Sequence, residues 1–146
     1  MRKTFFVVMA AALVLLALAP AAMSRESAAP TLTAKSSSYG RVLFDNRGYV
    51  LYAFTRDHKR SACYGECAKR WPPYFARKGT LRVGKGLKAS LLGTVKRRNG
   101  RRQVTYAGRP LYYYVGDTGP GVIRCQNVVE FGGRWLLVRP SGKLLR

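Results

Sequence analysis

Short hydrophobic stretches, rich in β-branched and aromatic residues, are separated by turn-forming residues along the chain, and this pattern predicts strands rather than long helices. One expected hairpin joins strands at 41–45 and 49–54 through the glycine-containing turn Asn46-Arg47-Gly48. A second expected hairpin has its turn at 107–110 and continues into a strand over 111–115. We therefore predict a mainly all-β fold.

The segment 94–105 carries the clearest hairpin pattern, because it is centred on Asn99-Gly100, the preferred two-residue turn. In the register that this turn sets, Val95 pairs with Val104. Arginines also face each other across the hairpin, which costs free energy because like charges repel. The facing pairs are Arg98 with Arg101 and Arg97 with Arg102. A later strand is expected over 134–138.

Part of the sequence repeats at a constant offset of 60 residues. YAFTRD at 52–57 matches YYYVGD at 112–117, and both copies have the form Tyr-x-aromatic-x-x-Asp. The recurring positions are Gly48, Leu51, Tyr52, Phe54 and Asp57, matched by Gly108, Leu111, Tyr112, Tyr114 and Asp117. We interpret the two stretches as copies of one β-hairpin unit within a small single domain.

The aromatic residues of this repeat are expected in the core. Because side chains alternate across a strand, Tyr52 shares a face with Phe54, and Tyr112 shares a face with Tyr114. Such aromatic stripes pack between sheets more often than they stack on a ligand. Each aspartate of the repeat follows its strand, where Asp most often accepts backbone N–H bonds in a turn. A metal site would need more oxygen ligands than the chain offers nearby.

Three cysteines raise the question of a disulfide. Cys63 and Cys67 are four residues apart in a short helix expected near 61–70, which ends before Pro72, so their sulfurs share one face. In an oxidising compartment, a Cys63–Cys67 bond with Cys125 free is the first interpretation. A bond from Cys125 to either of the others is the alternative, because connectivity does not follow from sequence.

Other chemistry for these residues has less support. His58 together with the three cysteines would form a Cys3His zinc set, but the spacing is not the usual C-x2-C. A redox-active dithiol is a second alternative, although no CxxC or CxxCH occurs. No nucleophile is marked for the Asp57-His58 pair, and the motifs GxSxG, HExxH and GxxxxGK do not occur. We predict a protein that is not an enzyme and holds no cofactor or metal.

The first residues, 1–24, have the layout of a secretory signal peptide. Two cations precede an uncharged apolar run at 5–19, which is shorter than the roughly 20 residues that a spanning helix needs. Cleavage after Ala22 or after Ser24 fits the preference for small residues, and an uncleaved anchor is the alternative. The sequence therefore predicts export.

The rest of the chain is expected to contain one folded domain. Small polar residues over 25–38 predict a flexible linker. The duplicated β-rich domain is expected over 39–140, and a basic tail over 141–146. A length of 146 residues fits one domain rather than two.

Basic residues dominate the charge of the chain. It has 27 Lys and Arg against 6 Asp and Glu, a formal net charge of +21, while 47% hydrophobic residues exclude a disordered polycation. Five cations cluster at the expected hairpin tip: Lys96, Arg97, Arg98, Arg101 and Arg102. A polyanion would relieve their mutual repulsion. The alternative is a solvated tip that protects a sheet edge from aggregation.

Several linked motifs resemble one bacterial family of secreted repeats, often labelled lipoproteins. They are the repeated Tyr-x-aromatic-x-x-Asp, CYGECAKRWPP at 63–73, QVTYAGRPLYYY at 103–114 and FGGRW at 131–135. The resemblance implies an exported protein with a duplicated β-rich domain. It implies no catalytic residues, because the family has no known function. The chain lacks a lipidation cysteine, and Cys125 stands where glycine is expected in many relatives.

Together these observations predict an exported, monomeric, non-catalytic module of the cell envelope or the secreted fraction. We expect it to bind an anionic envelope polymer or a lipid surface, without specific recognition of nucleic acid. One alternative is an accessory protein of redox or metal handling that uses the cysteines. A structural coat protein without a ligand is another.

Overall fold

The computed structural model describes residues 31–77, 79 and 81–146. The predicted signal peptide at 1–24 and the first part of the predicted linker lie outside the described residues. Among the residues that are described, no helix combines the length and the apolar character needed to cross a membrane.

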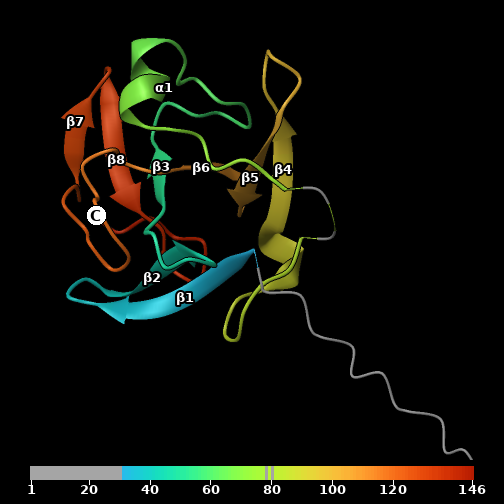
Figure 1. Cartoon of the computed structure of the whole chain (residues 1–146), viewed down its shortest axis with the longest axis vertical. Helices are drawn as coiled ribbons and strands as arrows, with labels where there is room; N and C mark the ends of the chain where they lie inside the picture. Colours follow the sequence, from blue (N-terminus) through green and yellow to red (C-terminus); the bar gives the residue numbers. More distant parts are fainter. Residues whose placement is uncertain (1–30, 78, 80) are drawn as a thin grey trace, which may run out of the picture.

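Two antiparallel sheets form the fold (Figure 1). The smaller sheet pairs β1 (Leu32–Ser37) with β2 (Gly40–Asp45). The larger sheet has the order β4-β5-β6-β3-β8-β7. Its strands are β3 (Tyr52–Phe54), β4 (Leu92–Lys96), β5 (Arg102–Tyr106), β6 (Arg109–Tyr112), β7 (Val128–Glu130) and β8 (Gly133–Leu137). This confirms the mainly all-β prediction.

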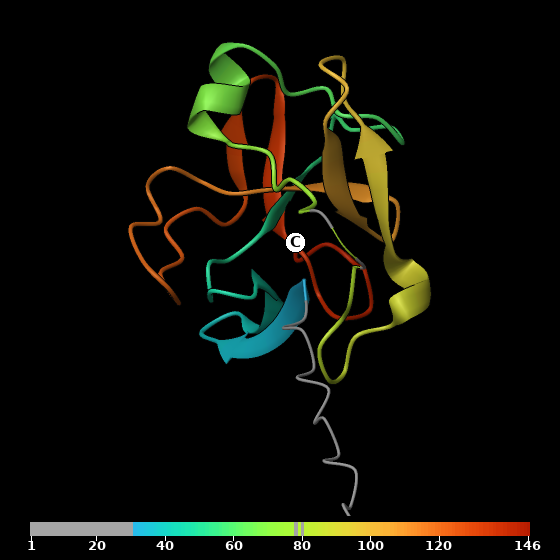
Figure 2. The same ribbon diagram turned by 45° about the vertical axis from the view of Figure 1, so that its right-hand side comes forward.

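The helices are short. α1 (Glu66–Arg70) lies within the segment where a helix was expected, and η1 (Ala89–Leu91) is a single 3-10 turn before β4. Figures 1 and 2 show α1 and the tip of the β4–β5 hairpin at one end of the molecule, with β1 and β2 at the other. Residues 97–99 of the hairpin tip line one surface hollow together with Gly65 and Ala68 at α1.

Alternating residues of the central strands enter two hydrophobic cores. Tyr52 and Phe54 pack in the first core, with Trp71, Tyr112 and Trp135. Between them in sequence, Ala53 points into the second core, which holds Leu51, Val104, Tyr106, Leu111 and Val138. Because both faces of β3 are covered, its three residues are all buried. The repeated aromatic residues are thus the centre of the first core, with Tyr114 partly buried at its margin.

The two repeat copies meet in the large sheet, because β3 pairs with β6 and Tyr52 lies opposite Tyr112. Antiparallel pairing of equivalent residues is the arrangement expected when two copies are related by a local two-fold axis. The second predicted hairpin is present with different bounds, since β5 pairs with β6 across the turn at Ala107-Gly108, and the strand after the turn covers Arg109–Tyr112 and not 111–115. The pairing of β3 with β6 therefore joins the two repeat copies in one continuous sheet.

The first predicted hairpin is only partly formed. Its turn exists, because the Asp45 N–H donates to the carbonyl of Tyr49 at 2.8 Å and Phe44 bridges to Val50. Beyond this point the strands diverge: β2 pairs with β1, whereas β3 pairs with β6 and β8. The prediction of one regular hairpin over 41–54 is wrong, because β2 pairs along its whole length with β1, whereas β3 lies between β6 and β8 in the larger sheet.

The predicted linker is wrong for its C-terminal part. Residues 32–37 form β1, and its pairing with β2 runs from Leu32 opposite Asp45 to Ser37 opposite Gly40. Leu32 is fully buried in the second core. No sequence pattern indicated this strand, because its small Thr, Ala and Ser side chains show little alternation between hydrophobic and polar residues. The strand forms through backbone hydrogen bonds, which do not require large side chains.

Candidate anion-binding site

The repeated Tyr and Asp residues are exchanged between the two copies. The Tyr52 hydroxyl donates to Asp117 Oδ2 at 2.8 Å, and the other oxygen of Asp117 accepts the Arg124 N–H. In the equivalent position, Asp57 lies beside the hydroxyl of Tyr112 and accepts the Ala62 N–H at 2.7 Å. Each aspartate therefore lies in the turn that follows its own strand, and its side chain interacts with the tyrosine of the other copy.

Burial raises the pKa of both aspartates of the repeated motif. Burial raises the pKa of Asp57 to about 6, although the Ala62 N–H opposes the shift. Burial also raises the pKa of Asp117, against the effects of the Arg124 N–H and the Tyr52 hydroxyl. Asp57 Oδ2 and the Tyr112 hydroxyl are buried and make no hydrogen bond of good geometry. The contact between Asp57 and Tyr112 is thus less completely hydrogen-bonded than the contact between Tyr52 and Asp117.

The first core contains a continuous aromatic stack. The ring of Trp135 stacks on Phe54 at 4.1 Å and on Trp71 at 4.0 Å between centroids, and Trp71 contacts Tyr114 at 4.6 Å. Trp71 also donates through Nε1 to Glu130 at 2.8 Å. Since both tryptophans are fully buried, this stack packs the core and offers no open face to a ligand.

The cysteine pairing is the one that the first interpretation expected, but Cys63 precedes α1, so the two cysteines do not share a helix face as predicted. Cys63 and Cys67 form a disulfide, and Cys125 is free and buried. Burial raises the pKa of the Cys125 thiol. The disulfide occupies two of the three sulfurs that a zinc set with the exposed His58 would need. Within residues 31–77, 79 and 81–146, no three His, Cys, Asp or Glu side chains are grouped to hold a metal.

The basic hairpin has a different register from the predicted one. Lys96 lies opposite Arg102 and Thr94 opposite Val104, because the loop contains three residues, 98–100, between Arg97 and Arg101. Gly100 has a φ of 80°, the left-handed residue that follows a type I turn in such loops. The Asn-Gly pair therefore occupies the end of a three-residue loop rather than a two-residue turn.

Arg97 is buried as a consequence, with only 5% of its surface exposed. Its guanidinium donates to Gln103 Oε1 at 2.7 Å and to the carbonyl of Cys63, and it lies over the ring of Tyr64. Arg97 links the hairpin to the disulfide loop and is not available to an external anion. The prediction that it contributes to an anion-binding tip is therefore wrong.

Four predicted tip cations remain exposed: Lys96, Arg98, Arg101 and Arg102. Aromatic rings hold two of them, since the guanidinium carbon of Arg98 lies 4.5 Å from the Tyr64 centroid and that of Arg101 lies 3.4 Å from the Phe75 centroid. Arg102 donates to Thr94 Oγ1 across the hairpin. These contacts reduce the freedom of the long side chains before any ligand is bound.

Two surface hollows adjoin the tip and share Pro73 and Phe75. One, of about 350 Å³, lies between the tip and α1 and is lined by Tyr64, Gly65, Ala68, Arg97, Arg98 and Asn99 in addition to the shared residues. The other, of about 270 Å³, contains three arginines, Arg47, Arg77 and Arg101. We call this second one the arginine hollow. Sequence reasoning missed Arg47 and Arg77, because they are distant in sequence from the tip.

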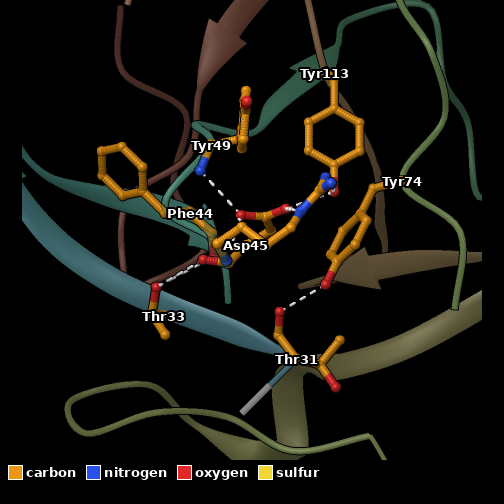
Figure 3. A network of polar contacts seen from close by, with 8 residues as sticks. Thr31, Thr33, Phe44, Asp45, Tyr49, Tyr74 and Tyr113 are labelled. Carbon is orange, nitrogen blue, oxygen red and sulfur yellow. Dashed lines mark hydrogen bonds and ion pairs between the residues drawn. The ribbon is translucent and has the colours of Figure 1, made fainter. Parts of the chain in front are cut away.

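The wall of the arginine hollow includes a polar network around Asp45 (Figure 3). The buried Asp45 carboxylate accepts the backbone N–H groups of Arg47 and Tyr49, both at 2.9 Å. It also accepts Nε of Arg47 at 3.0 Å and the hydroxyl of Tyr113 at 2.9 Å. The network holds Arg47, which lines the hollow together with Tyr74.

The family relationship agrees with this duplicated architecture. The family model described as a secreted repeat of unknown function matches the chain twice, at residues 33–74 and 93–139. Each match contains one copy of the Tyr-x-aromatic-x-x-Asp motif. The matches cover more than half of the chain, so the protein belongs to this family of secreted repeats. No significant match to a curated protein or to a solved structure was found.

Proposed function

We propose that this protein is an exported, non-catalytic module that binds an anionic polymer or lipid surface of the cell envelope through its basic hairpin tip. The family is described as secreted, which supports export. The observation that carries the binding proposal is the group of exposed cations at the tip, Lys96, Arg98, Arg101 and Arg102, two of which are held by aromatic rings.

The tip lacks compensating negative charge in the described part of the chain. The ion pairs found there join Asp45 to Arg47, Glu66 to Lys69 and Glu130 to Arg70, and none of them involves a tip residue. Concentrated positive charge of this kind attracts a polyanion, which gains affinity by releasing its small counterions. The proposal concerns a monomer and needs no recognition of a nucleic-acid sequence.

The experiment measures binding of the exported protein to vesicles that contain phosphatidylglycerol, and to DNA as a general polyanion, over a salt series. The tip variant Lys96→Gln/Arg98→Gln/Arg102→Gln should reduce the slope of log K against log salt on DNA by about 2 to 3, since each phosphate contact contributes about 0.9. A matched control removes three exposed cations distant from the tip: Arg124→Gln/Arg139→Gln/Lys143→Gln.

The comparison between the two triple variants separates local from diffuse attraction. They have the same net charge, so equal effects on the slope would show that the tip has no special role and would contradict the proposal. A larger effect of the tip variant on both vesicles and DNA would support it.

A further inference from the structure

We propose that the arginine hollow binds a phosphate group, either free or as a phosphodiester of an anionic polymer. This inference rests on the proposed function, because it names the chemical group that the basic surface recognises. The hollow brings together Arg47, Arg77 and Arg101, which belong to three separate segments of the chain. Among the hollows described, it is the one with the most arginines.

Two of these arginines are held in place before a ligand arrives. The guanidinium carbon of Arg101 lies over the ring of Phe75, 3.4 Å from its centroid. Arg47 is anchored through Nε by Asp45, and its guanidinium carbon lies 5.0 Å from the centroid of Tyr49. The exposed Arg77 follows a segment whose Ala76 N–H donates to the carbonyl of Arg102. Fixed guanidinium groups lose less entropy when they bind an anion.

The carboxylate in the wall does not prevent binding of an anion. Asp45 is only 1% exposed, and four donors from Arg47, Tyr49 and Tyr113 satisfy its two oxygens. Its charge is paired with that of Arg47. The charges of Arg77 and Arg101 have no such partner among the described residues, so the hollow keeps a positive balance.

The donor chemistry favours phosphate. All three cations are arginines, whose planar forks bind phosphate oxygens in pairs, whereas lysine acts as a point charge. The remaining wall is largely apolar or aromatic, with Pro73, Phe75 and Ala76. A water molecule takes about 30 Å³ in the liquid, so a hollow of about 270 Å³ has room for a phosphate group with part of an attached chain.

Binding of inorganic phosphate to the full exported chain tests this inference, with ³¹P NMR and calorimetry at constant ionic strength. We expect saturable binding of one phosphate per protein. Arg101→Gln and Arg77→Gln should each weaken it by about tenfold or more, in line with the loss of a charged hydrogen bond. Arg101→Lys should also weaken it, because the charge remains but the fork is lost. The matched control is Arg139→Gln, which removes an equal charge at the end of the molecule occupied by β1 and β2.

A second titration uses poly(glycerol phosphate) in place of inorganic phosphate, and it distinguishes a free phosphate ligand from a phosphodiester of a polymer. Saturable binding of inorganic phosphate alone supports a free ligand, and selective binding of the polymer supports a phosphodiester. The inference is overturned if neither probe saturates, or if Arg139→Gln weakens binding as much as Arg101→Gln does.

The two proposals can fail separately. Vesicle binding that depends on the tip, without a saturable phosphate site, would leave the proposed function intact and reject the phosphate site. Saturable phosphate binding with equal salt slopes in both triple variants would reject the tip and retain the phosphate site.

Discussion

Tyr52 and Tyr112, which are separated by 60 residues, lie directly opposite each other in the pairing of β3 with β6. Each is the first residue of its Tyr-x-aromatic-x-x-Asp motif, and each interacts with the aspartate of the other copy. The spacing within the motif fits this exchange, because each Asp lies in the turn after its own strand, where its N–H donates to the carbonyl of Phe54 or Tyr114, and its side chain reaches the tyrosine of the other copy. The motif therefore stabilises the association of two repeats, and its aromatic residues fill the core they share.

The exchange predicts unequal effects of removing the two hydroxyl groups. Tyr52→Phe removes the donor to the buried Asp117 and should lower the free energy of unfolding by about 1 to 3 kcal/mol. Tyr112→Phe should cost less, because that hydroxyl makes no well-formed hydrogen bond. Urea denaturation of both variants checks this, and equal losses would contradict the inequality that the structure implies.

Complete truncation of either ring should cost more. Tyr52→Ala and Tyr112→Ala should each lower the free energy of unfolding by about 3 kcal/mol or more, because both rings are fully buried. A loss near zero in urea denaturation would instead indicate that these rings form a binding surface.

The raised pKa of Asp57 makes stability depend on pH. Its pKa is about 6 in the folded protein and about 3.9 in the unfolded chain, so the folded state binds the proton more tightly. The free energy of unfolding should therefore fall as pH rises from about 4 to 6, by at most about 3 kcal/mol, and then level off. Asp57→Asn should remove most of this dependence.

The control for this titration is Glu66→Gln, because Glu66 is an exposed carboxylate paired only with Lys69. It should leave the pH profile of the wild type unchanged. Any dependence that persists in Asp57→Asn is expected from Asp117, whose pKa is raised in the same direction. Stability that increases from pH 4 to pH 7 would contradict the expected direction of the pH dependence.

The cysteine arrangement predicts one protected thiol. A thiol reagent should find no accessible thiol in the native protein and one in denaturant, because Cys125 is free and buried while the other two are bonded. Cys63→Ser/Cys67→Ser should destabilise by about 2 kcal/mol, the value for so short a closed loop. Two or three reactive thiols in native protein would instead favour the redox alternative.

Local sequence patterns predicted the repeat, the β-rich fold, the helix and the disulfide, because each depends on neighbouring residues or on a motif of fixed spacing. The arginine hollow could not be predicted in this way. Arg47 is placed by the Asp45 network, Arg77 by the pairing of its segment with β5, and Arg101 by the hairpin loop. Only the tertiary fold brings these three segments together.

The basic hairpin shows how a small error in a turn alters a functional prediction. Asn99-Gly100 is compatible with a two-residue turn and with the end of a three-residue loop. The choice shifts the register by one residue, and such a shift moves every side chain to the opposite face of its strand. Arg97 consequently points inward to Gln103, and Arg101 remains exposed beside Phe75.

The contrast between Arg97 and Arg98 gives a final test of this register. Arg97 is buried, donates to Gln103 and to the carbonyl of Cys63 and lies over the ring of Tyr64, so Arg97→Gln removes two buried charged hydrogen bonds and this ring contact. We expect a loss of about 2 to 4 kcal/mol in the free energy of unfolding. Arg98→Gln removes the same charge from the exposed neighbouring position and should change stability by no more than about 0.5 kcal/mol. Urea midpoints of the two variants measure the difference. Equal midpoints would favour the two-residue turn, in which both arginines are exposed, whereas a large difference requires the three-residue loop that turns Arg97 into the protein.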